Sequence, residues 1–202
     1  MTKKYTVKEI FSTIQGEGFW SGRAATFVRF TGCNLWSGLE VNRSRAICQF
    51  CDTDFVGGER YSLEELVSAV QSHRPKFVVF TGGEPGLQLD TQLVRELQRR
   101  GYYCAIETNG TVPIPPSLDW VCVSPKAGTE IVVSAADELK LVYPQDGLAP
   151  WLAQAKVSAK HKWLSPMDGP ALRKNIEKAA KYISEDCQWR LNVQAHKFWG
   201  IR

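Results

Sequence analysis

The segment KFVVFTGGEPG (residues 76–86) decides the fold, because it joins a short apolar run to a glycine-rich turn. Its aromatic and β-branched residues are typical of a buried strand, and the Gly-Gly pair ends that strand. The next segment, LDTQLVRELQRRG (residues 89–101), has the 3.6-residue apolar period of a helix, with Asp90 or Thr91 as its N-terminal cap and Gly101 behind it. Strand, turn and helix in this order predict one unit of an α/β fold.

The same alternation continues along the rest of the chain. Further strands are predicted in AATFVRFTG (24–32), YYCAIETNGT (102–111), DWVCVSPKAG (119–128), DELKLVYP (137–144), HKWLSPMDGP (161–170) and CQWRLNVQAH (187–196). Further helices are predicted in YSLEELVSAVQSH (61–73), LAPWLAQAKV (148–157) and GPALRKNIEKAAKYI (169–183). Near-continuous apolar strands between helices imply a parallel sheet, and about seven strands are too few for a complete eight-unit barrel. We therefore expect an α/β fold, a partial and open TIM-like barrel with few covering helices, in a single domain over residues 1–202.

Composition sets weak bounds on function. The 202 residues include 25 basic and 21 acidic ones, and the net charge of +4 permits an anionic ligand without demanding one. No stretch approaches the roughly 20 apolar residues of a membrane span, and no signal-peptide run follows the basic start. We expect a cytoplasmic protein without a membrane partner.

The segment CNLWSGLEVNRSRAICQFC (residues 33–51) holds three of the six cysteines. Clustered cysteines in a reducing compartment are more often metal ligands or catalysts than disulfides. A structural zinc site would need a fourth ligand, and none is near in the sequence. An iron–sulfur cube held by three cysteines would instead leave one iron open to a small molecule. The other three cysteines lie in apolar segments and are expected to be core residues: Cys104, Cys122 and Cys187.

Motifs at three successive strand ends resemble the radical S-adenosylmethionine (radical SAM) superfamily: CQFCDT (48–53), TGGEP (81–85) and ETNGT (107–111). In that superfamily three cysteines hold a [4Fe-4S] cluster whose open iron binds S-adenosylmethionine. Here residues 34–47 form an enlarged loop between the first and second cysteine. This long spacing, together with STIQGEG (12–18) and the C-terminal VQAHKFWGIR (193–202), is similar to one branch of the superfamily.

The resemblance implies the chemistry of that branch, which is the conversion of 6-carboxy-5,6,7,8-tetrahydropterin to 7-carboxy-7-deazaguanine. An electron from the reduced cluster cleaves S-adenosylmethionine, and the 5′-deoxyadenosyl radical removes a hydrogen atom from C6 of the pterin. Rearrangement contracts the ring, and loss of ammonia gives the product, a precursor of queuosine and other 7-deazapurines. We expect a lyase whose chemistry is centred on its cofactors, with no catalytic side chain of its own.

The resemblance also assigns ligands to the cofactors. Cys33, Cys48 and Cys51 are expected to bind the cluster. The expected contacts to S-adenosylmethionine are Phe50, Asp52, Gly82, Gly83, Glu84, Asn109, Ser124, Pro125, Lys126, Ser165 and Met167. Plain structural roles stay open for some of them: core packing for Phe50, a capped turn with a solvated lysine for Ser124 and Lys126, and turn shaping for Asn109.

The pterin is expected to contact Ile14, Gln15, Gly16, Glu17, Arg29, Thr81 and Arg202. QGEG (15–18) would supply amide and carboxylate groups from a flexible turn. An arginine within TFVRF is costly to bury without an anion, so capture of the pterin carboxylate is favoured over an ion pair with Glu84 or Glu107. The carboxylate of Arg202 is expected to reach the pterin amine, with a frayed tail as the alternative.

Mg²⁺ and protein partners are implied in the same way. Thr53 is the expected protein ligand of Mg²⁺, with Asp52 and Asp54 as alternatives. A homodimer and a flavodoxin-like electron donor are expected, the donor docking on Arg43 and Arg45, and no direct nucleic-acid contact is expected. Two other classes remain open: an activating enzyme for a glycyl-radical protein, and a noncatalytic module that binds zinc or RNA.

Overall fold

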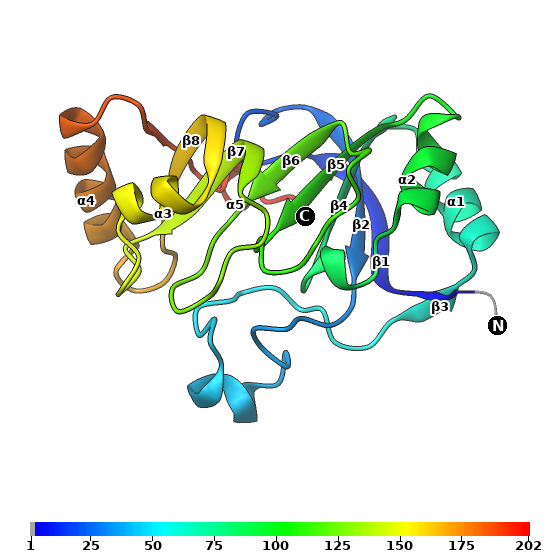
Figure 1. Cartoon of the computed structure of the whole chain (residues 1–202), viewed down its shortest axis with the longest axis horizontal. Coiled ribbons are helices and arrows are strands. Elements are labelled where there is room, and N and C mark those ends of the chain that lie inside the picture. The colour runs from blue at the N-terminus through cyan, green and yellow to red at the C-terminus, as the bar shows by residue number, and fades with distance from the viewer. Residues whose placement is uncertain (1–2) are drawn as a thin grey trace.

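The computed structural model describes residues 3–202 and contains one nine-stranded sheet in the order β3-β1-β2-β4-β5-β6-β7-β8-β9. The strands are β1 Tyr5–Ile14, β2 Ala24–Phe30, β3 Glu59–Tyr61, β4 Phe77–Gly82, β5 Tyr103–Thr108, β6 Trp120–Val123, β7 Ala135–Tyr143, β8 Ser158–Pro166 and β9 Arg190–Leu191. Every neighbouring pair from β2 to β9 is parallel, and β1 is antiparallel to both β2 and β3. Because β3 and β9 stand at opposite ends of this order, the sheet is open, which confirms the predicted partial barrel (Figure 1).

Helices flank the sheet at two places. They are α1 Leu63–Gln71, α2 Thr91–Gln98, α3 Pro150–Lys156, α4 Leu172–Glu185 and α5 Ala195–Trp199, with short 3₁₀ turns η1 Glu40–Arg45 and η2 Pro85–Leu87. In Figure 1, α1 and α2 lie beside the β1 to β5 half, α3 and α4 lie beside the β7 and β8 half, and the loop between β2 and β3 projects from the body.

Alternation along the strands assigns each residue to one of the two faces of the sheet. In β4, Val78 and Phe80 belong to the core cluster that includes residues of α1 and α2, whereas Phe77 and Val79 belong to a separate cluster on the opposite face, with Trp20 packed against it. Since successive side chains of a strand point to opposite faces, the helices cover one face and leave the other for a site.

The same rule places the charged residues of the strands. Arg29 lies between Val28 and Phe30 of the helix-covered core, and Lys140 lies between Leu139 and Leu141 of the second core cluster. Arg29 and Lys140 therefore point to the face that the helices leave free.

Two strands, β1 and β3, are absent from the sequence prediction. The pairing of β1 with β2 shifts its register between Val7 and Glu9, and this irregularity breaks the apolar alternation by which a strand is recognised. The three residues of β3 are too few to carry a period.

The end of the chain also differs from expectation. Only Arg190–Leu191 of the predicted strand 187–196 joins the sheet, and Cys187 is exposed, so its prediction as a core residue is wrong. Cys104 and Cys122 are buried as predicted. Among the described residues, no helix is both long and apolar enough to span a membrane.

Candidate active site

Two adjoining cavities lie at the carboxyl ends of the parallel strands. The first, of about 230 Å³, is lined by Cys33, Cys48 and Cys51 and is called the cysteine cavity. The second, of about 510 Å³, is lined by Arg29 and Arg202 and is called the arginine cavity. The residues that line both are Glu17, Asp52, Thr53, Thr81, Glu107 and Gln194. A reactive group formed in one cavity therefore has a short path to a molecule in the other.

The donor set of the cysteine cavity suits an iron–sulfur cluster better than zinc. All three thiols are free, and the cavity lining contains neither a fourth cysteine nor a histidine. Within residues 3–202, no three Cys, His, Asp or Glu side chains are grouped closely enough to hold a single metal ion. Zinc needs all its ligands around one point, whereas a cluster gives each thiolate its own iron, so its ligands are spread apart. Three thiols without a fourth protein ligand fit a cluster with one iron left open.

The surroundings of the three thiols shift their pKa values in different directions. The backbone N–H of Leu35 donates to Cys33 Sγ at 3.4 Å. A side-chain hydrogen bond with Cys48 lowers the pKa of Cys51 to about 6, and the same contact raises the pKa of Cys48. Burial raises the pKa of Cys33, while the Lys126 ammonium opposes the increase at Cys48. N–H donors and a nearby cation are what a thiolate ligand set requires.

Arg43 holds the loop around the cysteines. Its guanidinium lies 4.1 Å from the centre of the Trp36 ring, pairs with Glu40, and donates to the carbonyl oxygens of Gln49 at 2.8 Å and Cys51 at 3.0 Å. These contacts shape the turn that presents the second and third cysteines. Arg43 and Arg45 are the two arginines expected to contact the electron donor. Because Arg43 points into the loop, only Arg45 of the two is exposed.

The two glycines of TGGEP allow β4 to end against β2. A Cβ on Gly83 would lie 2.1 Å from the carbonyl oxygen of Gly32, and one on Gly82 would lie 2.3 Å from that of Phe30. Only glycine fits such close backbone contacts. Both glycines line the cysteine cavity and expose backbone groups to it.

Glu84 has a different place from the one expected. Its carboxylate is fully buried and accepts hydrogen bonds from the Thr108 hydroxyl at 2.7 Å and the backbone N–H groups of Asn109 at 2.7 Å and Gly86 at 2.9 Å. It does not line the cavity, and burial raises its pKa. Its contacts join the end of β4 to the end of β5, so in this arrangement it supports the site from behind.

Of the remaining residues expected at S-adenosylmethionine, all but one line the cysteine cavity. Pro125 does not line either cavity, and its carbonyl accepts from the Gln145 side chain at 3.3 Å. Lys126 donates to the Ser124 hydroxyl at 2.8 Å. The residues that do line the cysteine cavity are Phe50, Asp52, Gly82, Gly83, Asn109, Ser124, Lys126, Ser165 and Met167.

All seven residues expected at the pterin line the arginine cavity: Ile14, Gln15, Gly16, Glu17, Arg29, Thr81 and Arg202. The disfavoured alternative for Arg29, an ion pair with Glu84 or Glu107, is not found, and its Nε instead lies 2.9 Å from Glu9 Oε1. Glu9 stands opposite Arg29 in the antiparallel register of β1 and β2.

The last residue is held at the site. Its carbonyl oxygen accepts from the Thr13 hydroxyl at 2.7 Å, and its guanidinium pairs with Glu9 and lies 4.7 Å from the centre of the Phe11 ring. The C-terminal residue thus rests on β1 beside the arginine cavity instead of fraying.

Backbone hydrogen bonds and aromatic contacts hold the turn between β1 and β2, for which the sequence predicted flexibility. Gln15 N donates to Arg23 O and Gly22 N to Gln15 O, both at 2.8 Å. Phe19 and Trp20, in the same turn, pack against Trp120 with ring centres 5.0 and 5.2 Å away. These aromatic contacts hold Gln15 and Glu17 at the cavities.

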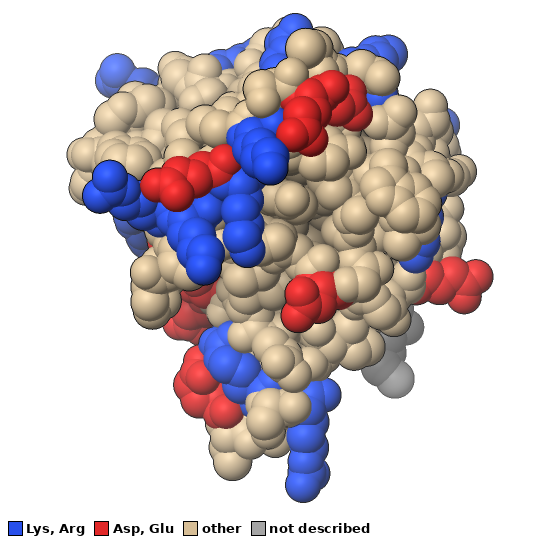
Figure 2. Space-filling view, turned by 90° about the vertical axis from the view of Figure 1, so that its left-hand side faces the viewer, with Lys and Arg blue, Asp and Glu red and all other residues tan. Residues whose placement is uncertain are grey.

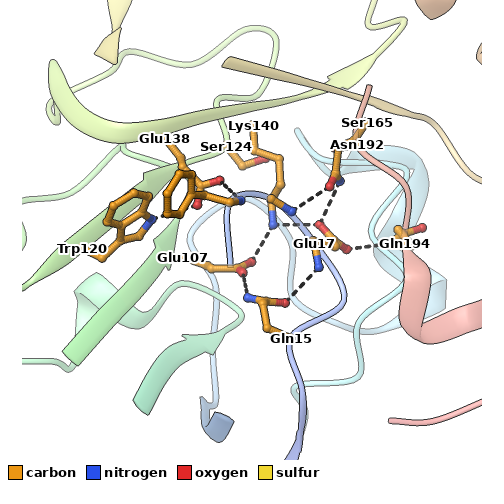
Figure 3. Close-up of polar contacts among 12 residues, drawn as sticks. Gln15, Glu17, Glu107, Trp120, Ser124, Glu138, Lys140, Ser165, Asn192 and Gln194 are labelled. Carbon is orange, nitrogen blue, oxygen red and sulfur yellow. Dashed lines mark hydrogen bonds and ion pairs between the residues drawn. The ribbon is translucent and has the colours of Figure 1, made fainter. Parts of the chain in front are cut away.

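A buried ion cluster missed by sequence reasoning joins this turn to β5 and β7 (Figure 3). Lys140 Nζ lies 2.7 Å from Glu17 Oε2 and 2.9 Å from Glu107 Oε2. Gln15 donates to Glu107 at 2.9 Å, and Gln194 donates to Glu17 at 3.1 Å. Burial works to raise the pKa of Glu17, but Lys140 holds it below its ordinary value. The available signal was a charged residue within each apolar strand, AIET and LKLV.

An open, mostly parallel α/β barrel with three cysteines at the carboxyl ends of its strands defines the radical SAM class. A family model described as the radical SAM superfamily matches residues 42–135. The chain is 49% identical to a 7-carboxy-7-deazaguanine synthase of Bordetella pertussis and 50% identical to one of Bradyrhizobium diazoefficiens, over 98% of this chain and 99% of each relative. The crystal structure of QueE from Escherichia coli matches with a TM-score of 0.74 and 27% identity, over 96% of this chain and 95% of that one. The chain therefore belongs to the 7-carboxy-7-deazaguanine synthase family of radical SAM enzymes, the branch that the sequence motifs resemble.

Proposed function

We propose that this chain converts 6-carboxy-5,6,7,8-tetrahydropterin to 7-carboxy-7-deazaguanine with loss of ammonia. The observation that carries the proposal is the pair of adjoining cavities, one lined by three free thiols and the other by arginine, amide and carboxylate groups. The names of the relatives support the same reaction. The long cysteine spacing and the small polar cavity do not favour a glycyl-radical activating enzyme, whose substrate would be a protein.

The cysteine cavity would hold the cofactors. When bound, a [4Fe-4S] cluster and S-adenosylmethionine supply an organic radical that can remove a hydrogen atom from the substrate. Cys33, Cys48 and Cys51 would bind the cluster, and the exposed backbone of Gly82 and Gly83 would accept hydrogen bonds from the methionine ammonium. The other lining residues would orient the adenosine and exclude water.

The arginine cavity would hold the pterin. The pterin carboxylate would pair with Arg29, whose partner in this structure is Glu9 at 2.9 Å. The donor-rich amide edge of the pterin would form hydrogen bonds with Gln15 and Glu17 of the turn between β1 and β2. Thr81 would be a further hydrogen-bond donor. Residues from several different elements would thus fix the hydrogen that reacts near the cysteine cavity.

Mg²⁺ would bind at Thr53, which lines both cavities. The neighbouring carboxylates already pair with cations, Asp52 with Lys197 at 2.8 Å and Asp54 with Lys8 at 2.8 Å. Mg²⁺ commonly joins a sparse protein shell to an anionic ligand, so a hydroxyl and the pterin carboxylate suit it. A Thr53→Ala variant with an unchanged Mg²⁺ dependence of turnover would refute this assignment.

A flavodoxin-like electron donor would dock on the loop of residues 34–47, which projects from the body (Figures 1 and 2). In Figure 2 this loop carries basic and acidic side chains, and so does the face over α4. Arg45→Glu is expected to slow reduction of the cluster, with Arg173→Glu on α4 as the control. Equal reduction rates in the two variants would refute docking at the loop.

A homodimer is the proposed assembly. The C-terminal segment exposes Phe198 at 76% and Trp199 at 47% of their surfaces. Exposed large aromatic side chains next to one another are typical of a protein interface. Sedimentation should give a dimer that Phe198→Ser weakens; a wild-type monomer at micromolar concentration would refute the proposal.

An anaerobic turnover assay tests the proposed reaction. Reconstituted protein is mixed with reductant, Mg²⁺, S-adenosylmethionine and the pterin, and the products are read by mass spectrometry. Formation of 7-carboxy-7-deazaguanine is the expected result. If 5′-deoxyadenosine accumulates without it, the proposed substrate is wrong.

A further inference from the structure

Lys140 is a buried cation without an assigned role. It lies in β7 between Leu139 and Leu141 of the second core cluster, and only 6% of it is exposed. A buried ammonium is costly unless anions compensate it, and lysine seldom occupies such a position. Here Glu17 and Glu107 supply that compensation at 2.7 and 2.9 Å.

The two carboxylates reach Lys140 from different parts of the fold. Glu17 comes from the turn between β1 and β2, whereas Glu107 lies in β5. Both line the two cavities, and Lys140 itself lines the cysteine cavity. Without the ammonium, two carboxylates converging on one point would repel each other and separate. The position of this wall between the cavities therefore depends on Lys140.

The remaining hydrogen-bond capacity of the carboxylates is available to a ligand. Glu17 Oε1 accepts from Gln194 and Glu107 Oε1 accepts from Gln15, so each of these oxygens has one protein donor. A carboxylate oxygen can accept two hydrogen bonds. Two carboxylates facing one ammonium also leave one net negative charge, which suits a ligand edge rich in N–H donors.

We propose that Lys140 is a positioning residue that holds Glu17 and Glu107 side by side so that they accept hydrogen bonds from the N–H donors of a bound pterin. This inference rests on the proposed function and deepens it, because it names the group that organises the wall shared by the two cavities. Lys140 acts on the pterin through the two carboxylates, which its Nζ contacts directly.

Other titratable groups surround the cluster, and two of them, Lys126 and His196, line the cysteine cavity and the arginine cavity. Glu138, on the same strand, accepts from Phe19 N and Trp120 Nε1, both at 2.8 Å. The other titratable groups that influence the cluster are Cys122, Lys126 and His196. Burial keeps the Cys122 pKa far above its ordinary value, so this thiol adds no charge near neutrality. Lys140 is thus the cation that Glu17 and Glu107 share.

The test is the affinity of the cluster-reconstituted protein for the pterin, measured anaerobically by calorimetry with S-adenosylmethionine present and no reductant. Lys140→Met is expected to weaken pterin binding at least about tenfold, as expected when one partner of a buried charge pair is removed. Affinity for S-adenosylmethionine, measured separately, should fall less than affinity for the pterin, because the carboxylates that Lys140 holds also line the arginine cavity. Lys160→Met removes an exposed lysine of β8 paired with Asp137 at 3.0 Å and is the matched control.

The pH profile separates positioning from a merely structural role. In Lys140→Met the two carboxylates would share a proton at low pH and repel each other at high pH, so pterin affinity should fall as pH rises relative to wild type. Lys140→Arg keeps the charge and the fold but moves the donors, and it should weaken pterin binding several-fold. This second variant keeps the test decisive if Lys140→Met does not fold.

The outcomes are distinguishable. If the wild-type protein does not bind the pterin at all, the proposed function fails. If the wild type binds it and both Lys140 variants bind equally well with parallel pH profiles, the proposed function stands and the positioning role is refuted.

Discussion

At the scale of single residues, two polar side chains near this site bond to the backbone: that of Glu84, which is buried, and that of Arg43, which is partly exposed. Glu84 accepts three hydrogen bonds from the ends of neighbouring segments, and Arg43 fastens two carbonyl groups of the cysteine loop. Sequence motifs such as TGGEP assign polar residues like Glu84 to ligands because they stand next to residues that line the cavities. Which atoms they meet depends on the fold, and full burial of Glu84 turns its carboxylate toward the protein.

The first prediction concerns Glu84→Gln. The amide keeps the shape of the carboxylate, but its NH₂ group replaces one of the two accepting oxygens. That oxygen accepts a hydrogen bond from either Asn109 N–H or Thr108 O–H, so one of these donors loses its acceptor. A buried donor left without an acceptor costs about 1–3 kcal/mol, so the free energy of unfolding in urea should fall by that amount. Glu177→Gln, on the exposed surface of α4, is the control and should change stability by less than about 0.5 kcal/mol. Equal effects of the two changes would show that Glu84 does not tie β4 to β5.

At the scale of elements, the sequence predicted those whose apolar period is regular. The strands from β4 to β8 and helices α1 and α2 were found because burial on one or both faces dictates their pattern. Strand β1 was missed because its register shift interrupts the alternation. The partner of Arg29 was missed with it, since Glu9 lies on that strand. Lys140, Glu107 and Glu17 are 33 to 123 positions apart in the chain, and only the folded sheet brings them together.

The second prediction concerns the start of α2. Asp90 caps the helix by accepting from Leu93 N at 2.9 Å, and it also accepts from the Tyr5 hydroxyl and pairs with Lys3. Burial works to raise the pKa of Asp90, but Lys3, Leu93 N–H and Tyr5 together hold it below its ordinary value. A carboxyl with a lowered folded-state pKa contributes stability above its unfolded pKa and loses it as pH falls through the folded pKa.

Asp90→Asn keeps a cap and loses the charge, so it should destabilise the protein by roughly 0.5–1 kcal/mol at pH 7, a modest value because Lys3 is half exposed. This difference should shrink as pH falls below about 4, where the carboxyl of the unfolded chain takes up a proton first and the folded carboxyl follows at lower pH. Urea unfolding at several pH values measures it. Asp90→Ala removes the cap and should be less stable than wild type at every pH. If the difference in unfolding free energy between Asp90→Asn and wild type does not change with pH, the charge of Asp90 does not contribute to stability.

At the scale of the whole molecule, the two ends of the sequence meet at the site. The segment before β2 supplies Gln15 and Glu17, and the segment after β9 supplies Gln194 and Arg202 to the same arginine cavity. Ala195 N donates to Gly16 O at 2.9 Å and the Thr13 hydroxyl donates to Arg202 O at 2.7 Å. The sheet is open, and these terminal contacts bring the last element, α5, against the turn that follows the first long strand. Residues from both terminal segments therefore line one cavity.

The third prediction follows from this closure. A short Gly-Ser tail added after Arg202 converts the terminal carboxylate to an amide and leads more chain past the arginine cavity, where Arg202 rests on Thr13 and Phe11. Loss of one charged hydrogen-bond acceptor corresponds to about 1.5–3 kcal/mol, so the KM for the pterin should rise roughly tenfold or more. Affinity for S-adenosylmethionine should not change, because Arg202 does not line the cysteine cavity. The same tail placed before residue 1 is the control, since β1 begins at Tyr5 within the opposite, helix-covered core. An unchanged KM with the C-terminal tail would mean that the carboxylate of Arg202 does not reach the pterin, and that the last residue only packs against β1.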